Sequence, residues 1–170
     1  VYSHIRLAKR PEDIHAIRVT AGHADLVIGC DLVVTGAKKV LTALKKDRSA
    51  VFVNTAETLP GDFTRAADFS LPVERIKRAI TSANGRAGTF MIDATTAATA
   101  FLGNAIAANM FLLGFAWQSG RVPLREASLI KAIQLNGEAV AMNLGTGDVP
   151  EGTVIVVERI GHRNYFYWDA

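Results

Sequence analysis

The segment Asp25-Leu26-Val27-Ile28-Gly29-Cys30-Asp31 is a continuous apolar run of strand length, closed by an aspartate suited to a helix N-cap. Such a run predicts a central parallel strand that is buried on both faces. From Val33 to Leu44 apolar residues repeat at helical spacing, which predicts one amphipathic helix of about four turns. A second apolar strand is predicted over residues 50–55. The strand, helix and strand together indicate a right-handed crossover unit of an α/β fold.

Further elements of the same two kinds flank this unit. Alternating character predicts a half-buried strand over residues 1–8, and a shorter run predicts another over residues 14–19. Downstream we expect a helix from Pro72 to the Asn84-Gly85 stop, a strand over residues 89–92 and a helix over residues 123–136. Residues 153–160 and 164–168 are β-branched and aromatic, which is typical of a hairpin. The predicted fold is α/β, a mostly parallel sheet flanked by helices, with a C-terminal β-hairpin.

The segment from Ala94 to Gly120 contains no charged residue. Its length raises the question of a membrane span, but Asn104, Asn109 and Gln118 interrupt it, and isolated amides are unfavourable in lipid. We therefore expect no membrane span and one long helix, apolar on every side, that is buried either in this core or against another chain. Asn104 and Asn109 then require hydrogen-bond partners, either neighbouring backbone groups or a ligand.

The composition excludes several classes of protein. With 170 residues, 49% of them hydrophobic and 21% charged, the chain has the composition of one compact domain rather than of a disordered protein. The single cysteine and four histidines show no ligand spacing, so we expect no metal site, no intrachain disulfide and a reducing, cytoplasmic location. The net charge of +3 is small and no aromatic residues interleave with the basic clusters, so no nucleic-acid partner is expected.

A few polar positions allow more than one reading. Asp31 is either a helix cap or part of a nucleotide site at the end of its strand, although the repeated glycines of such a site are missing. Cys30 is either a buried thiol or a nucleophile activated by the helix that follows it. His4 and Arg6 share one strand face, which either meets an acidic partner or a phosphate, or is a solvated sheet edge. The residues form no paired-carboxylate, Ser-His-Asp or metal site, so no catalytic residue is predicted.

Several segments also match the pattern of a known family. They are Ser3-His4-Ile5-Arg6-Leu7, Ala24 to Asp31, Val53-Asn54-Thr55, Val122-Pro123-Leu124, Ala132-Ile133 and, as the most specific element, Gly103-Asn104 followed by Asn109-Met110 and Gly114. Together they resemble the gamma-type domain of the 2-oxoacid:ferredoxin oxidoreductases, most closely that of the fused bacterial indolepyruvate ferredoxin oxidoreductases. The resemblance covers roughly residues 1 to 144.

The resemblance implies an enzyme that decarboxylates indolepyruvate or another 2-oxoacid on thiamine diphosphate, passes the product to coenzyme A, and sends electrons through iron-sulfur clusters to ferredoxin. One cysteine is too few for a cluster, so this chain is expected to bind none of these cofactors and to be inactive alone.

The same resemblance implies a scaffold that packs against other domains or subunits of an oligomeric oxidoreductase and helps to close the substrate and coenzyme site. Ser3, His4, Arg6, Asn104 and Asn109 would lie at the substrate or partner-domain interface. The alternative, from another class, is a non-catalytic α/β binding or assembly module.

Two departures from the family pattern concern the ends of the chain. The family's glycine-rich loop and first helix, which precede the segment matching Val1 to Leu7, have no counterpart here, and residues 145–170 match nothing. We therefore expect residues 1–145 to form a gamma-type α/β domain that is incomplete at its N-terminus. Residues 146–170 are expected to form a β-hairpin extension.

Overall fold

The computed structural model describes residues 2–57, 71–135 and 154–159, and its architecture is α/β, as predicted. One sheet contains five strands in the order β1-β5-β2-β3-β4. They are β1 (Tyr2–Leu7), β2 (Leu26–Gly29), β3 (Ala50–Asn54), β4 (Thr89–Ile92) and β5 (Val154–Arg159). Strands β2, β3 and β4 are parallel, whereas β5 is parallel to β1 and antiparallel to β2.

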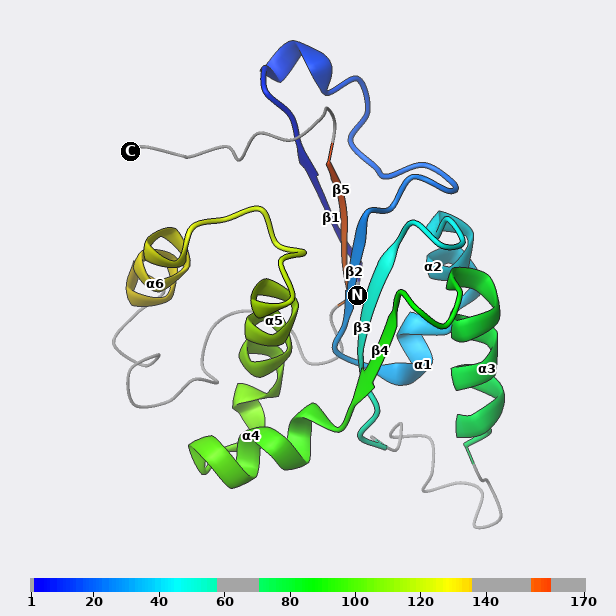
Figure 1. Ribbon diagram of the computed structural model, residues 1–170, viewed down its shortest axis with the longest axis vertical. Helices are drawn as coiled ribbons and strands as arrows, with labels where there is room; N and C mark the ends of the chain where they lie inside the picture. Colours follow the sequence, from blue (N-terminus) through cyan, green and yellow to red (C-terminus); the bar gives the residue numbers. More distant parts are fainter. Residues whose placement is uncertain (1, 58–70, 136–153, 160–170) are drawn as a thin grey trace.

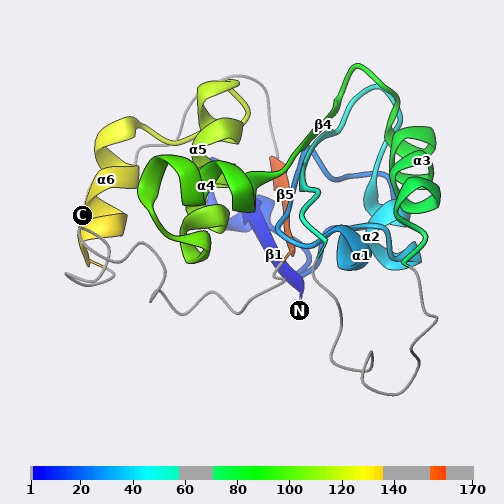
Figure 2. The ribbon, with the colours of Figure 1, turned by 90° about the horizontal axis from the view of Figure 1, so that it is seen from below.

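Helices cover both faces of the sheet (Figure 1). One face carries α1 (Leu32–Thr35), α2 (Lys38–Ala43) and α3 (Val73–Asn84). The other face carries α4 (Ala94–Leu102), the 3-10 turn η3 (Ala105–Ala107) and α5 (Ala108–Gln118). Helix α6 (Glu126–Leu135) lies on the far side of α5 from the sheet, and Figure 2 shows the same arrangement from below. A short 3-10 turn, η1 (Pro11–Asp13), follows β1.

The core has two layers because successive side chains of a strand point to opposite faces. Val27 and Val51 pack with the helices α1, α2 and α3, while Leu26 and Phe52 pack with α4 and α5. Phe52 is fully buried, and its ring lies parallel to that of Phe90 at a centroid distance of 4.6 Å. Both faces of the central strands are therefore buried, as the continuous apolar runs predict.

Most of the predicted elements are confirmed. The strand over residues 1–8 is β1, the two central apolar runs are β2 and β3, and the strand over residues 89–92 is β4. The helix after Pro72 is α3, with Pro72 at its N-cap, and the helix expected over residues 123–136 is α6, which begins at Glu126. Asp31 Oδ1 accepts a hydrogen bond of 2.7 Å from Val34 N, so the predicted cap is also confirmed.

The prediction of one helix from Asp31 to Leu44 is wrong. The segment forms two short helices, α1 and α2, because Ala37 adopts an extended backbone between them. Gly36 ends the first helix at a point where a Cβ atom would collide with the side chain of Ile76 on α3. Close packing of α3 at this position selects glycine, and glycine weakens helix continuation.

The strand predicted over residues 14–19 is also wrong. This segment has no regular structure, and Ile17 is 92% exposed, whereas Val19 is buried. Side chains of β1 hold its backbone instead of a strand ladder: Arg6 Nη1 donates to Ala16 O at 2.7 Å, and Val19 N donates to His4 Nδ1 at 3.3 Å. The periodicity of the sequence does not show that the backbone of residues 14–19 bonds to side chains of β1 and not to the main chain of a neighbouring strand.

The single helix predicted from Ala94 to Gly120 is broken in the middle. Gly103 has a left-handed φ of 72°, and Asn104 has an extended backbone and caps η3 by accepting a hydrogen bond of 2.9 Å from Ile106 N. The Gly-Asn pair is thus a helix stop followed by a helix start. Among the described helices, none is long and apolar enough to cross a membrane.

The predicted C-terminal hairpin is not what the described part of this segment forms. Residues 154–159 form β5, as a strand was predicted there, but β5 is paired on both edges, to β1 and to β2, so neither edge is open to a second hairpin strand. Residues 164–168 lie outside the described residues. The boundary at residue 145 stays a prediction, and β5, which follows that boundary, lies inside the sheet formed by the preceding strands.

Candidate functional site

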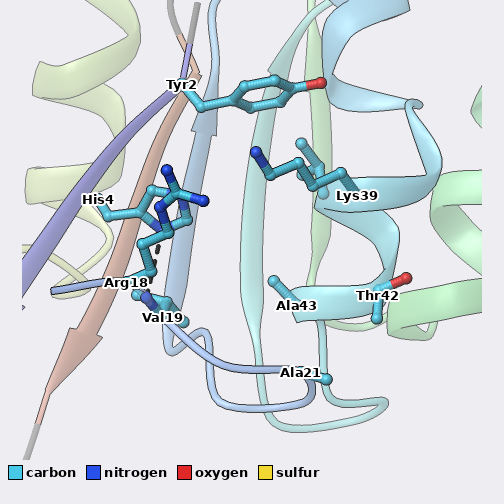
Figure 3. A pocket seen from close by; sticks show the side chains of 9 residues that line it. Tyr2, His4, Arg18, Val19, Ala21, Lys39, Thr42 and Ala43 are labelled. Atoms are coloured by element: carbon cyan, nitrogen blue, oxygen red, sulfur yellow. Dashed lines mark hydrogen bonds between the residues drawn. The ribbon is translucent and has the colours of Figure 1, made fainter. Parts of the chain in front are cut away.

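A small pocket lies between β1 and α2 and is open to solvent (Figure 3). Its volume is about 90 Å³, and it is lined by Tyr2, His4, Arg18, Val19, Ala21, Lys39, Val40, Thr42 and Ala43. Three separate segments supply these residues: β1, the irregular connection before β2, and α2. The two hydrogen bonds from β1 to residues 16 and 19 hold that connection in place and so shape one wall of the pocket.

Among the described residues that line this pocket, the charged groups, Arg18 and Lys39, are cationic. Lys39 Nζ lies 4.9 Å from the centroid of the Tyr2 ring, a cation-π contact that orients the ammonium group. Burial lowers the pKa of His4, and the nearby charges of Lys39 and Arg18 lower it further. The imidazole is therefore held mostly neutral at pH 7, and because its Nδ1 accepts the Val19 hydrogen bond, Nε2 carries the proton.

A second group of polar residues lies where β2, β3 and β4 end. Asn54 is 6% exposed, and its side chain joins the three strand ends. Its Oδ1 accepts hydrogen bonds from Ala94 N at 3.0 Å and Ala56 N at 3.1 Å, and its Nδ2 donates to Thr95 Oγ1 at 3.0 Å and to Cys30 O at 3.4 Å. Every donor and acceptor of this amide is used, so Asn54 serves as a structural link that fixes the start of α4.

The residues beside Asn54 resolve two of the alternatives left open by the sequence. Asp31 caps α1, which is the structural interpretation of that residue. Burial, with a smaller contribution from the charge of Asp31, raises the pKa of the Cys30 thiol to about 11. A buried thiol with so high a pKa is a poor nucleophile at neutral pH, which favours the buried-residue interpretation of Cys30.

The described residues do not fit the metal cofactors implied by the family resemblance. In residues 2–57, 71–135 and 154–159, no group of three or more His, Cys, Asp or Glu side chains could hold a metal ion. The whole sequence has one cysteine, whereas an iron-sulfur cluster requires several thiolates.

Apolar side chains are exposed where α4 ends and η3 begins. Phe101 is 77% exposed, Leu102 is 45% exposed and Ile106 is 57% exposed, and we call these three residues the α4–η3 surface. The Phe101 ring stacks on the ring of Phe111 at a centroid distance of 6.4 Å, which orients it on α5. The sequence left two alternatives for the uncharged segment: burial in the chain's own core or burial against another chain. Complete burial in its own core is wrong, because Phe101, Leu102 and Ile106 are exposed to solvent.

The residues expected at an interface do not form one cluster. His4 lies on the α2 side of the sheet, where it lines the pocket, and Arg6 shares that face of β1 by strand alternation. Ser3 lies on the opposite face of β1, the face from which Leu7 packs toward the cluster that contains α4 and α5. Asn104 and Asn109 belong to η3 and α5 on that second side.

Several functional candidates escape sequence reasoning. Tyr2, Arg18 and Lys39 meet at the pocket only because a connection and a helix pack beside β1, and no local pattern signals that meeting. Phe101 and Ile106 were missed for another reason. The absence of charged residues from Ala94 to Gly120 predicts that both are buried in a helix, whereas both are exposed. The Gly103-Asn104 pair is the signal that could have found them, since it predicts a helix boundary.

Comparison with known protein families shows where this chain belongs. The sequence profile of the family described as "Pyruvate ferredoxin/flavodoxin oxidoreductase" matches residues 1–148. No curated protein and no solved structure matches the chain. The matched range contains β1 to β4 and α1 to α6, and therefore the pocket and the α4–η3 surface as well.

Proposed function

The chain belongs to the pyruvate ferredoxin/flavodoxin oxidoreductase family, and we propose that it is a non-autonomous domain that packs against the catalytic domains of an indolepyruvate-type enzyme. Family membership indicates a domain of a ferredoxin-dependent 2-oxoacid oxidoreductase. The whole enzyme would use thiamine diphosphate, iron-sulfur clusters and coenzyme A to convert a 2-oxoacid to an acyl-CoA. None of these groups is assigned to this chain.

The α4–η3 surface is the observation that carries this proposal. Three large apolar side chains lie within six residues and are all exposed, although monomeric proteins usually bury such clusters. The elements α4, η3 and α5, which carry this surface, contribute no charge, since the sequence is uncharged from Ala94 to Gly120. An apolar surface without charges is typical of the centre of a permanent interface between domains.

The polar candidates divide between two surfaces in this proposal. Asn104 and Asn109 make polar contacts to the partner domain near the α4–η3 surface, and Ser3 faces the same side of the sheet. His4 and Arg6 lie on the opposite side and would contact substrate or a second partner there. Cytoplasmic location, oligomerisation, delivery of electrons to ferredoxin and the absence of membrane or nucleic-acid partners belong to the same proposal.

The experiment compares single serine variants of exposed apolar residues in the assembled oxidoreductase. Phe101→Ser and Ile106→Ser should each weaken association with the thiamine-dependent domains by about 2 kcal/mol, roughly 30-fold, as expected for central interface residues. Association is measured by analytical ultracentrifugation, and turnover is measured with indolepyruvate and with pyruvate. Ile17→Ser is the matched control, because Ile17 is more exposed than either residue and lies outside this surface.

The outcomes separate the proposal from its alternatives. Equal association of all three variants would exclude the α4–η3 surface as the interface. Failure of the wild-type chain to associate with thiamine-dependent domains would favour a non-catalytic binding or assembly module. Faster turnover of pyruvate than of indolepyruvate would be compatible with the proposed domain role, but it would contradict indolepyruvate as the substrate.

A further inference from the structure

From the pocket between β1 and α2 we infer a binding site for a tetrahedral oxyanion, namely a phosphate group, held by Arg18, Lys39 and His4. This site lies on the opposite face of the sheet from the α4–η3 surface. The inference of a phosphate site rests on the geometry of the pocket and does not depend on the proposed docking role of the α4–η3 surface.

Like charges converge at this pocket. Arg18 comes from the connection before β2 and Lys39 from α2, and Figure 3 shows the guanidinium and the ammonium groups pointing toward each other across the pocket. Two cations that face each other repel, and their charges add to burial, the main cause, in lowering the pKa of His4. An anion placed between them would relieve that repulsion.

Among the described residues that line the pocket, no carboxylate competes for these cations. No Asp or Glu lines the pocket, and in the described part of the chain no carboxylate lies within 4.0 Å of Arg18 or Lys39. Other cations of this protein have such partners, as Arg48 does with Asp25 at 2.9 Å. The pocket therefore keeps its positive charge available for a ligand from solution.

The pocket also offers several hydrogen-bond donors. Lys39 and Arg18 can only donate, and Nε2 of His4 is the protonated nitrogen of its ring. Thr42 adds no donor, because its hydroxyl donates to the backbone oxygen of Lys38 at 2.7 Å. Within the described part of the chain these three groups have no acceptor partner, which suits a phosphate, whose oxygens accept several hydrogen bonds.

The size of the pocket limits what it can hold. A volume of about 90 Å³ is smaller than the roughly 150 Å³ of a protein cavity that holds one benzene ring. A phosphate group fills such a space, whereas a nucleobase or an indole ring needs more. The ligand is therefore inorganic phosphate, or the phosphate end of a larger metabolite whose remainder stays in solvent.

The site can be tested by NMR titration of the ¹⁵N-labelled 170-residue chain. Inorganic phosphate and glycerol 3-phosphate are the two probes, with sodium chloride at equal ionic strength as the reference. Saturable shifts are expected at the amides of Val19, Ala21 and residues 39–43. Tighter binding of glycerol 3-phosphate would identify an ester as the ligand, and tighter binding of inorganic phosphate would identify the free ion.

Variants distinguish a built site from general surface charge. Arg18→Ala and Lys39→Ala should each raise the dissociation constant for phosphate at least tenfold. Lys38→Ala is the matched control, since Lys38 is the exposed neighbour of Lys39 and does not line the pocket, and it should change the constant less than twofold. The inference is overturned if no saturable shift occurs up to about 50 mM phosphate, or if Lys38→Ala weakens binding as much as Lys39→Ala.

Discussion

Replacing Asn54 by leucine is expected to destabilise the fold strongly, although the two side chains have similar size. Asn54 Oδ1 accepts hydrogen bonds from Ala94 N and Ala56 N, and Nδ2 donates to Thr95 Oγ1 and to Cys30 O. Leucine removes all four hydrogen bonds at once and places a branched apolar group against polar backbone atoms. The junction between β3 and α4 should therefore loosen.

The size of the destabilisation depends on whether each group that loses its hydrogen bond to Asn54 can form one to water instead. Ala94 is fully buried, so its N–H would stay unsatisfied at a cost of about 1–3 kcal/mol. Ala56 and Thr95 are half-buried and regain part of their hydrogen bonding from solvent, which adds about 1 kcal/mol. We expect a total loss of about 3 kcal/mol in the free energy of unfolding, equivalent to a fall in Tm of about 9 °C.

Urea unfolding followed by circular dichroism measures this loss, with Thr95→Val as the matched control. The control removes only the bond to Asn54 Nδ2 and should cost about 1 kcal/mol. If Asn54→Leu costs no more than Thr95→Val, the buried Ala94 N–H does not cause most of the destabilisation and the reasoning fails. Because α4 carries Phe101, Asn54→Leu should also weaken docking in the assembled enzyme.

Three further predictions concern single residues. Because burial, Lys39 and Arg18 lower the pKa of His4 below 6.5, the unfolded chain binds a proton before the folded chain does, so the free energy of unfolding should fall as the pH drops below about 6.5. His4→Gln should flatten this profile in urea unfolding at several pH values, and an unchanged slope would contradict the prediction. Since burial raises the pKa of Cys30 to about 11, iodoacetamide at pH 8 should alkylate the native chain about a hundredfold more slowly than the unfolded chain, and equal rates would contradict it. Gly103→Ala should destabilise the fold by about 1 kcal/mol, because the φ of Gly103 is 72°. Gly114→Ala should stabilise it by about 0.5–1 kcal/mol, because Gly114 lies inside α5 with open space around it. Thermal unfolding measures both changes, and changes of the same sign would contradict the prediction.

Local signals were sufficient for much of the fold. The apolar runs of β2 and β3, the strand Thr89–Ile92 and the Asp31 cap depend on a few neighbouring residues, and each lies where the sequence predicts it. The errors arise where a distant element decides. Gly36 interrupts a helical pattern because α3 packs against it, and residues 14–19 stay irregular because β1 side chains bind their backbone.

The candidate site was less predictable for the same reason. The polar face of β1 could be read from alternation, and it does supply His4 to the pocket. Arg18 and Lys39 reach that pocket from segments whose position depends on tertiary packing. In the uncharged segment, composition suggested burial, but the turn at Gly103 exposes Phe101 and Ile106 instead.

The position of β5 has a consequence for biosynthesis. Within the described sheet β1 contacts only β5, and Tyr2 pairs with Val154, so the ribosome produces the two partners roughly 150 residues apart. At about 5–20 residues per second, β5 is synthesised roughly 6–30 s after β1 and β2, the strands that it joins. Both open edges can pair with other nascent chains during that interval. Chains truncated before residue 154 would keep these edges exposed. Such chains would be prone to aggregation and would be substrates for chaperones and proteases.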